Sequence, residues 1–175
     1  MEQTLAPGQI IILNGAPRSG KSSIIEVIQD TFDGVWMNLG VDGFMQMTPA
    51  RYLPGMGLRP GHHDAYAVRR GILPDCARRL SGLPVLFVGV RSPIETIMDR
   101  RRTMGWETGA PADAPAPRPV LLWQREVHTP GIYDLEVDTS VLGPEACAAL
   151  IRRHLDNGPP PSAFRQLAAM RTTQN

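Results

Sequence analysis

The fold of this chain is decided by the stretch Gly15-Ala16-Pro17-Arg18-Ser19-Gly20-Lys21-Ser22, which Ser23 follows. The stretch matches the pattern G-x-x-x-x-G-K-[ST] at every fixed position. An apolar run precedes it and apolar residues at helical spacing follow it, so it lies between a predicted strand and a predicted helix. In such a loop, successive backbone N–H groups and the positive end of the helix point at a phosphate. The sequence therefore predicts a nucleotide-binding P-loop.

Two side chains of the loop have expected roles in binding ATP and Mg²⁺. Lys21 would reach the β- and γ-phosphates, and the Ser22 hydroxyl would coordinate Mg²⁺. The chain has 18 basic residues, and Lys21 is the sole lysine among them. A lysine that survives a bias toward arginine marks a place where a compact, flexible ammonium matters more than a planar guanidinium.

Apolar runs alternate with helical patterns along the rest of the chain. Strands are predicted at residues 9–14, 35–39, 83–90 and 133–137, and helices at residues 21–31, 93–102, 143–155 and 164–170. This alternation is typical of an α/β domain with a mainly parallel sheet, which binds ligands at the carboxyl ends of its strands. We expect residues 1–175 to form one P-loop NTPase-type three-layer sandwich of the nucleotide-kinase kind. A segment rich in proline and alanine, at about 103–119, would be a lid.

Composition narrows the function classes. A 175-residue chain that is 42% hydrophobic suits one globular domain, and a net charge of +1 gives no footprint for nucleic-acid binding. No stretch approaches the length of a membrane span and the N-terminus lacks a signal-peptide pattern, so we expect a cytoplasmic protein. Cys76 and Cys147 have no metal-ligand or disulfide spacing and are expected to be thiols in the core. The sequence does not predict the oligomeric state.

The acceptor of the phosphate would be activated by a carboxylate. An alcohol is a poor nucleophile, so a kinase gains from a base that takes its proton and orients its oxygen. Asp42 is the best candidate, because it follows the predicted strand at 35–39 and has Gly40 and Gly43 on either side. The alternative is a turn aspartate that makes a local hydrogen bond.

Arginines before the lid are candidates for stabilising the transferring phosphoryl group. Arg100, Arg101 and Arg102 end a predicted helix, and positive charge on a closing lid would neutralise the phosphoryl oxygens. They could equally form a solvated helix end, where arginine complements the helix dipole. We select Arg100 as catalytic from the resemblance described below.

Two further groups of residues could form an acceptor pocket. His62-His63-Asp64 is better explained as a substrate-binding loop than as a metal site, because adjacent histidines do not easily share one ion. Near Asp42, four apolar residues could line a pocket or belong to the core: Trp36, Phe44, Met45 and Met47. We expect Phe44, His63 and Asp64 to contact the acceptor.

The residues leave several functions open. The first is a small-molecule kinase with Asp42 as its base. Phosphorylation of another hydroxyl, on a nucleoside or a sugar nucleotide, is an alternative, because pocket residues rather than the P-loop select the acceptor. A third possibility is a regulator that binds ATP and hydrolyses it slowly or not at all.

The sequence also resembles the chloramphenicol phosphotransferase family of P-loop kinases. The resemblance rests on four blocks in the same order: residues 11–15 leading into the P-loop, Gly40-Val41-Asp42, residues 86–91, and the segment from Val127-His128 through Gly131 to Ser140. It implies ATP- and Mg²⁺-dependent 3-O-phosphorylation of chloramphenicol or a related compound, in a cytoplasmic protein that confers antibiotic resistance. Asp42 matches the general base of the family, Lys21 and Ser22 its phosphate and magnesium contacts, and Arg100 an arginine at the start of its lid. Asp138 and Thr139 would lie near the adenine.

The resemblance also implies that this chain lacks a helix and a strand that its relatives have. Relatives carry a further helix and strand before the block at His62, whereas here Leu58-Arg59-Pro60-Gly61 runs directly into it. Four strands are predicted where that fold has five, so we expect a segment to be absent between about residues 57 and 62. The lost strand would lie beside the strand that carries the P-loop, and its loss would expose a row of backbone groups.

Overall fold

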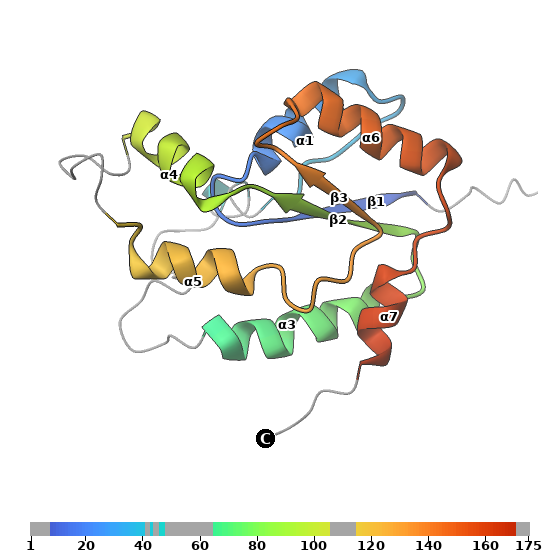
Figure 1. Ribbon diagram of the computed structural model, residues 1–175. Coiled ribbons are helices and arrows are strands. Elements are labelled where there is room, and N and C mark those ends of the chain that lie inside the picture. The colour runs from blue at the N-terminus through green and yellow to red at the C-terminus, as the bar shows by residue number, and fades with distance from the viewer. Residues whose placement is uncertain (1–7, 41–42, 44–45, 48–64, 106–114, 171–175) are drawn as a thin grey trace, which may run out of the picture.

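The computed structural model describes residues 8–40, 43, 46–47, 65–105 and 115–170, with only the backbone of 65–72. These residues fold into a parallel sheet with helices on both faces (Figure 1). In chain order the elements are β1 (Ile10–Asn14), α1 (Lys21–Thr31), α3 (Ala65–Leu80), β2 (Val85–Arg91), α4 (Ile94–Thr103), α5 (Arg118–Glu126), β3 (Leu135–Asp138), α6 (Pro144–Asn157) and α7 (Ala163–Ala169). The fold class is therefore α/β with three layers, as the sequence predicts.

The middle strand, β2, joins the sheet together. The order is β1-β2-β3, both pairs are parallel, and the register places Ile12 beside Phe87 and Val90 beside Val137. Helices α1 and α6 cover one face of the sheet, while α3 and α7 cover the other (Figure 1). All three strands consequently end at the same edge of the sheet, where the P-loop follows β1.

The core has two halves, one on each face of β2. Leu86, Val88 and Val90 pack among residues of α1 and α6, whereas Val85 and Phe87 pack among residues of α3 and α7. Successive side chains of a strand point to opposite faces, so an unbroken apolar run is what a strand buried on both faces requires. Residues 85–90 of β2 are all buried, and the prediction of this strand is confirmed.

The predicted strand at 35–39 does not form. Residues 35–40 have no regular secondary structure, although α1 before them ends as expected. A strand is stable only when its backbone groups pair with a neighbour. Within the described residues the outer edge of β1 is unpaired, and residues 35–39 do not pair with it. The prediction was wrong because a strand pattern does not show whether the segment pairs with a neighbour.

Two helices were not predicted from the sequence. Helix α3 contains Pro74 in its interior, and α5 begins at Arg118, inside the segment expected to be a lid. Residues 106–114 of that segment lie outside the described part of the chain. Nowhere in the described part is a helix both long and apolar enough to cross a membrane.

One carboxylate connects three elements of the fold. Asp134, at the entrance to β3, accepts hydrogen bonds from the backbone N–H groups of Phe87 (2.9 Å), Ser162 (2.6 Å) and Ala163 (2.9 Å). The last two lie at the start of α7, where helix N–H groups lack partners within the helix. Asp134 therefore holds α7 against β2 and β3.

We expect Asp134→Ala to destabilise the protein by about 2–3 kcal/mol, because hydrogen bonds to charged groups are stronger than neutral ones and three N–H groups lose their acceptor. Asp134→Asn, which keeps one acceptor oxygen, should fall between Ala and the wild type. Urea denaturation monitored by circular dichroism measures both. The exposed carboxylate Asp156 provides a control, since Asp156→Ala should change stability by less than about 0.5 kcal/mol.

Candidate functional site

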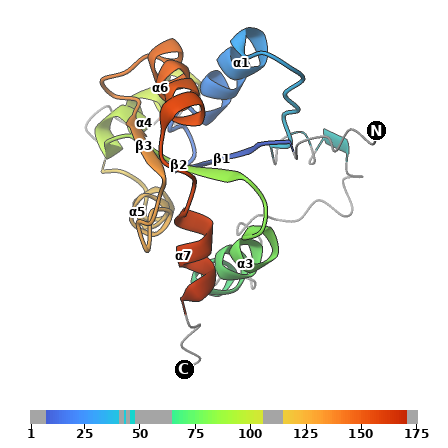
Figure 2. The ribbon, with the colours of Figure 1, turned by 90° about the vertical axis from the view of Figure 1, so that its right-hand side faces the viewer.

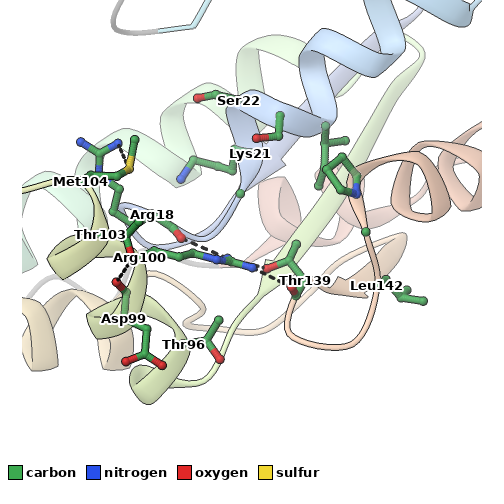
Figure 3. Close-up of a pocket in the computed structure, with 15 residues that line it drawn as sticks. Arg18, Lys21, Ser22, Thr96, Asp99, Arg100, Thr103, Met104, Thr139 and Leu142 are labelled. Atoms are coloured by element: carbon green, nitrogen blue, oxygen red, sulfur yellow. Dashed lines mark hydrogen bonds between the residues drawn. The ribbon is translucent and has the colours of Figure 1, made fainter.

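A cleft of about 550 Å³ opens at the carboxyl ends of the strands. It lies between the P-loop with the first turn of α1, the inner side of α4 and the loop that follows β3 (Figure 3). Seven of its residues were predicted to belong to the site: Arg18, Gly20, Lys21, Ser22, Ser23, Arg100 and Thr139. Eight others complete it: Ile24, Thr96, Asp99, Thr103, Met104, Leu142, Gly143 and Pro144.

Tight packing requires glycine at the first position of the P-loop. A Cβ atom on Gly15 would lie 2.5 Å from the carbonyl oxygen of Val90 and 2.5 Å from Ser19 Oγ. Gly20 has φ 91° and Arg18 has φ 69°, so two positions of the loop are left-handed. Glycine adopts this conformation readily, whereas a side chain such as that of Arg18 makes it costly. The P-loop therefore holds two left-handed residues, one of which, Arg18, adopts this backbone conformation at an energetic cost.

The first turn of α1 faces the cleft without a capping side chain. Its N-cap is Gly20, and the first turn holds no acidic residue. Helix N-terminal N–H groups carry partial positive charge and attract anions. Beside them, Lys21 Nζ donates to the carbonyl oxygens of Gly15 and Ala16, each at 2.8 Å. The ammonium therefore lies within the loop that is expected to hold phosphate.

Arg100 connects the three walls of the cleft. From α4, its Nη1 donates to the carbonyl oxygen of Arg18 (3.2 Å) and to Thr139 Oγ1 (3.0 Å), and its Nη2 donates to the Thr139 carbonyl oxygen (2.7 Å). Figure 3 shows the guanidinium extending from α4 to Thr139. In this structure Arg100 holds the P-loop, α4 and the loop after β3 in fixed relative positions.

The loop after β3 completes this connection. Thr139 Oγ1 donates to the carbonyl oxygen of Ser19 at 2.8 Å, and its side chain packs on Gly20. Asp138 accepts hydrogen bonds from the backbone N–H (2.8 Å) and the hydroxyl (2.6 Å) of Ser140, which lower the pKa of its carboxyl. Asp138 thus shapes the turn from outside the cleft, while Thr139 lines the cleft directly.

Arg18 places a second cation near Lys21. Its Nη1 lies 3.1 Å from the thioether sulfur of Met104, at the end of α4. Figure 3 shows the guanidinium of Arg18 and the ammonium of Lys21 on the same side of the cleft, with Thr139 and Leu142 on the opposite side. The end of the cleft at Lys21 and Arg18 is therefore cationic. The other end is a loop of small and apolar residues, to which the Arg100 guanidinium is hydrogen-bonded.

A partly buried polar network supports the start of the P-loop. Asn14, the last residue of β1, donates through Nδ2 to the Val127 carbonyl oxygen and to Tyr133 Oη, both at 2.7 Å. The Tyr133 hydroxyl also lies 2.8 Å from His128 Nδ1, and the tautomer of the imidazole sets which of the two groups donates. The Tyr133 ring fits because residue 89 is glycine, where a Cβ would lie 2.8 Å from the ring.

The environment strongly favours neutral His128. Burial, above all, and the positive charges of Arg91 and Lys21 lower the pKa of His128 from 6.5 to about 4, although Glu136 acts in the opposite direction. Burial likewise raises the pKa of Tyr133. The network therefore remains uncharged near neutral pH and fixes the position of Asn14.

Several predicted site residues are not placed in the cleft. Asp42, Phe44, His63 and Asp64 lie outside the described residues, as do His62 and Met45. Four P-loop residues form the loop without lining the cleft: Gly15, Ala16, Pro17 and Ser19. Trp36 packs against the core near α1 and α6 and stacks edge-on with Phe32. The described residues include no group of three or more His, Cys, Asp or Glu that could hold a metal ion.

Three residues of α4 line the cleft but were not predicted from the sequence, although a pattern in the sequence marks them. Thr96, Asp99 and Thr103 follow the spacing i, i+3, i+7, and Arg100 belongs to the same face. Residues three and four apart lie together on one side of a helix. A polar stripe beside a predicted arginine could have identified them. Leu142 and Pro144 carry no such signal, because the course of the loop after β3 brings them into the cleft.

Comparisons with known proteins point to one family. The sequence model of the chloramphenicol phosphotransferase-like proteins matches residues 8–70 and 63–156, in two overlapping pieces. The chain is also 23% identical over 210 residues to provisionally named O-phosphotransferases from two strains of Mycobacterium tuberculosis. The alignments cover 91% of this chain and 88% of each relative. The alignment is 210 positions long, but 91% of this 175-residue chain is only about 159 residues. About 50 aligned positions of the relatives therefore have no counterpart in this chain.

The neutral state of His128 should make stability depend on pH. Between about pH 6.5 and 4 the unfolded chain binds a proton at this histidine and the folded chain does not, so stability should decrease as the pH falls. His128→Gln, whose side chain can still accept from Tyr133, should have a shallower dependence over this range. Urea midpoints measured from pH 7 to 4 test this. Equal slopes for the two proteins would contradict a half-buried histidine that stays neutral in the folded chain.

Proposed function

This chain belongs to the chloramphenicol phosphotransferase-like family, and on that premise we propose that it transfers the γ-phosphate of ATP to a hydroxyl group of a small molecule. The family and the relatives mark it as a phosphotransferase. The nucleotide, the metal and the acceptor are our proposals, with the 3-hydroxyl of chloramphenicol as the first acceptor to test.

The observation that carries this proposal is the cationic end of the cleft. Lys21, Arg18 and the uncapped first turn of α1 are gathered there, and an anion that carries several charges is the ligand that suits them. A triphosphate extended from this end would place its base toward Thr139, Leu142 and Pro144. The volume of about 550 Å³ is in the usual range for a small-molecule site.

Lys21 would exchange its present partners for phosphate oxygens. Hydrogen bonds to an anionic oxygen are stronger than those to neutral carbonyls, so a nucleotide can draw the ammonium away from Gly15 and Ala16. The Ser22 hydroxyl lines the same part of the cleft and is a suitable oxygen ligand for Mg²⁺, together with the phosphates themselves. Magnesium would neutralise charge on the phosphates.

In the proposed transfer, the acceptor hydroxyl oxygen attacks the γ-phosphorus as its proton passes to the carboxylate of Asp42. A new O–P bond forms, the bond between the γ-phosphorus and the β,γ-bridging oxygen breaks, and ADP leaves. Arg100 already donates to Arg18 and Thr139, so it would act chiefly by keeping the P-loop and the loop after β3 aligned.

An ADP-release assay tests the reaction. With ATP and Mg²⁺, we expect chloramphenicol to stimulate ADP release and to gain one phosphate by mass spectrometry. Lys21→Ala should reduce turnover by about 10²-fold or more, because a donor to the transferring group is lost. Arg153→Ala, on the exposed side of α6, is the matched control and should be near wild type. ATP binding without stimulation by chloramphenicol would reject this acceptor and lead to a screen of other hydroxyl compounds.

Replacing Asp42 separates catalysis from nucleotide binding. Asp42→Asn keeps the shape of the side chain but cannot take a proton at neutral pH, so kcat should decrease by about 10²–10⁴-fold. ATP affinity, measured by calorimetry, should hardly change. Asp156→Asn serves as the control for a carboxamide replacement elsewhere. Turnover that survives in Asp42→Asn would remove Asp42 from the mechanism.

A further inference from the structure

Arg18 holds a backbone conformation that its side chain disfavours. Its φ is 69°, and in the described part of the chain every other residue with a positive φ is a glycine. Neighbouring elements impose this conformation, because Arg100 donates to the Arg18 carbonyl oxygen (3.2 Å) and Thr139 donates to that of Ser19 (2.8 Å). Backbone strain persists only where the surrounding structure imposes it, and it is concentrated at functional sites. An arginine where glycine would fit without strain therefore indicates a function for its side chain.

The Arg18 guanidinium donates to a weak acceptor. Its Nη1 lies 3.1 Å from the thioether sulfur of Met104, whose side chain is 58% exposed. A thioether is a neutral, weak acceptor, whereas hydrogen bonds from a guanidinium to phosphate oxygens are among the strong ones. A phosphate in the cleft would therefore draw Arg18 away from Met104. The contact with Met104 meanwhile keeps the guanidinium at the cleft.

Arg18 lies at the end of the cleft where the terminal phosphate of a nucleotide would lie. The P-loop leads into α1 and the loop after β3 leads into α6, and these two helices lie side by side (Figure 2). With the base toward Thr139 and Leu142, a triphosphate would extend toward Lys21 and Arg18, on the opposite side of the cleft (Figure 3). Two arginines line the cleft among the described residues, and Arg100 is hydrogen-bonded at the base end. Arg18 is thus the arginine at the phosphate end.

We propose that Arg18 is a catalytic residue of the transfer, whose guanidinium donates hydrogen bonds to the γ-phosphoryl oxygens. This role rests on the proposed function and adds to it the group that stabilises the transferring phosphoryl. Charge is spread over three oxygens of that group in the transition state, and a planar guanidinium presents two parallel N–H donors to them. The guanidinium keeps its proton throughout, so Arg18 acts by its charge alone. Because Arg18 belongs to the P-loop itself, no lid movement is needed to bring it to the phosphate.

Calorimetry with MgATP and MgADP tests which phosphate Arg18 contacts, and it needs no acceptor. Since ADP lacks the γ-phosphate, Arg18→Gly should raise the dissociation constant of MgATP at least about tenfold and that of MgADP less than about twofold. Arg18→Lys, which keeps the charge but loses the planar fork, should lie between Arg18→Gly and the wild type for MgATP. Arg153→Ala removes a positive charge from the exposed side of α6 and should leave both constants unchanged.

The same Arg18→Gly variant separates a catalytic role from a structural one. Glycine adopts the left-handed conformation without strain, so the urea midpoint of this variant should not fall below that of the wild type. Its kcat for acceptor-dependent ADP release should nevertheless decrease by about 10²-fold, because a donor to the transferring group is lost.

The possible outcomes distinguish this role from the proposed function. Equal weakening of MgATP and MgADP binding, a lower urea midpoint or an unchanged kcat in Arg18→Gly would each overturn the role of Arg18, while nucleotide binding by the wild type would stand. A wild type that binds neither nucleotide would instead reject the proposed function, and the role of Arg18 with it.

Discussion

The candidate site depends on the position of β2 between the other two strands. Pairing of β1 and β3 with opposite sides of β2 brings the P-loop and the loop after β3 to the same edge of the sheet. The approach is so close that Gly15 leaves no room for a Cβ atom beside the Val90 carbonyl. Helix α4, which starts soon after β2 ends, then supplies the third wall. Burial of β2 on both faces keeps this arrangement rigid, and loss of its packing would separate all three walls at once.

Backbone carbonyl oxygens position two of the cations in the site. Lys21 donates to the carbonyl oxygens of Gly15 and Ala16, and Arg100 donates to those of Arg18 and Thr139. These hydrogen bonds fix the ammonium and the guanidinium relative to the backbone of the P-loop and of the loop after β3. A phosphate bound beside the P-loop would therefore meet cations whose positions the fold already restricts.

Sequence patterns correctly predicted the elements whose structure is set by neighbouring residues in the chain. Fixed spacing identified the P-loop, and continuous apolar runs identified β1 and β2. The segment at 35–39 has an equally good strand pattern, yet it does not pair, because pairing is decided by a neighbour that may be distant in the chain. The partners of Arg100 were likewise invisible, since backbone carbonyls at residues 18 and 139 have no signature of their own. Helix α3 was not predicted because it contains Pro74, and proline in the interior of a helix usually ends it.

The open edge of β1 and the candidate site are mechanically connected. Asn14 ends β1 and its side chain binds Val127 and Tyr133, after which the chain turns immediately into Gly15. A strand that is paired on one side only has fewer restraints than β2, and local opening begins where restraints are few. Any strand that pairs with the outer edge of β1 would therefore steady the residue from which the P-loop starts. Covering the edge and binding a nucleotide would both favour the same ordered β1, and two events that favour one state reinforce each other. Among the described residues, the strand that is paired on one side only is thus the strand that carries the phosphate-binding loop.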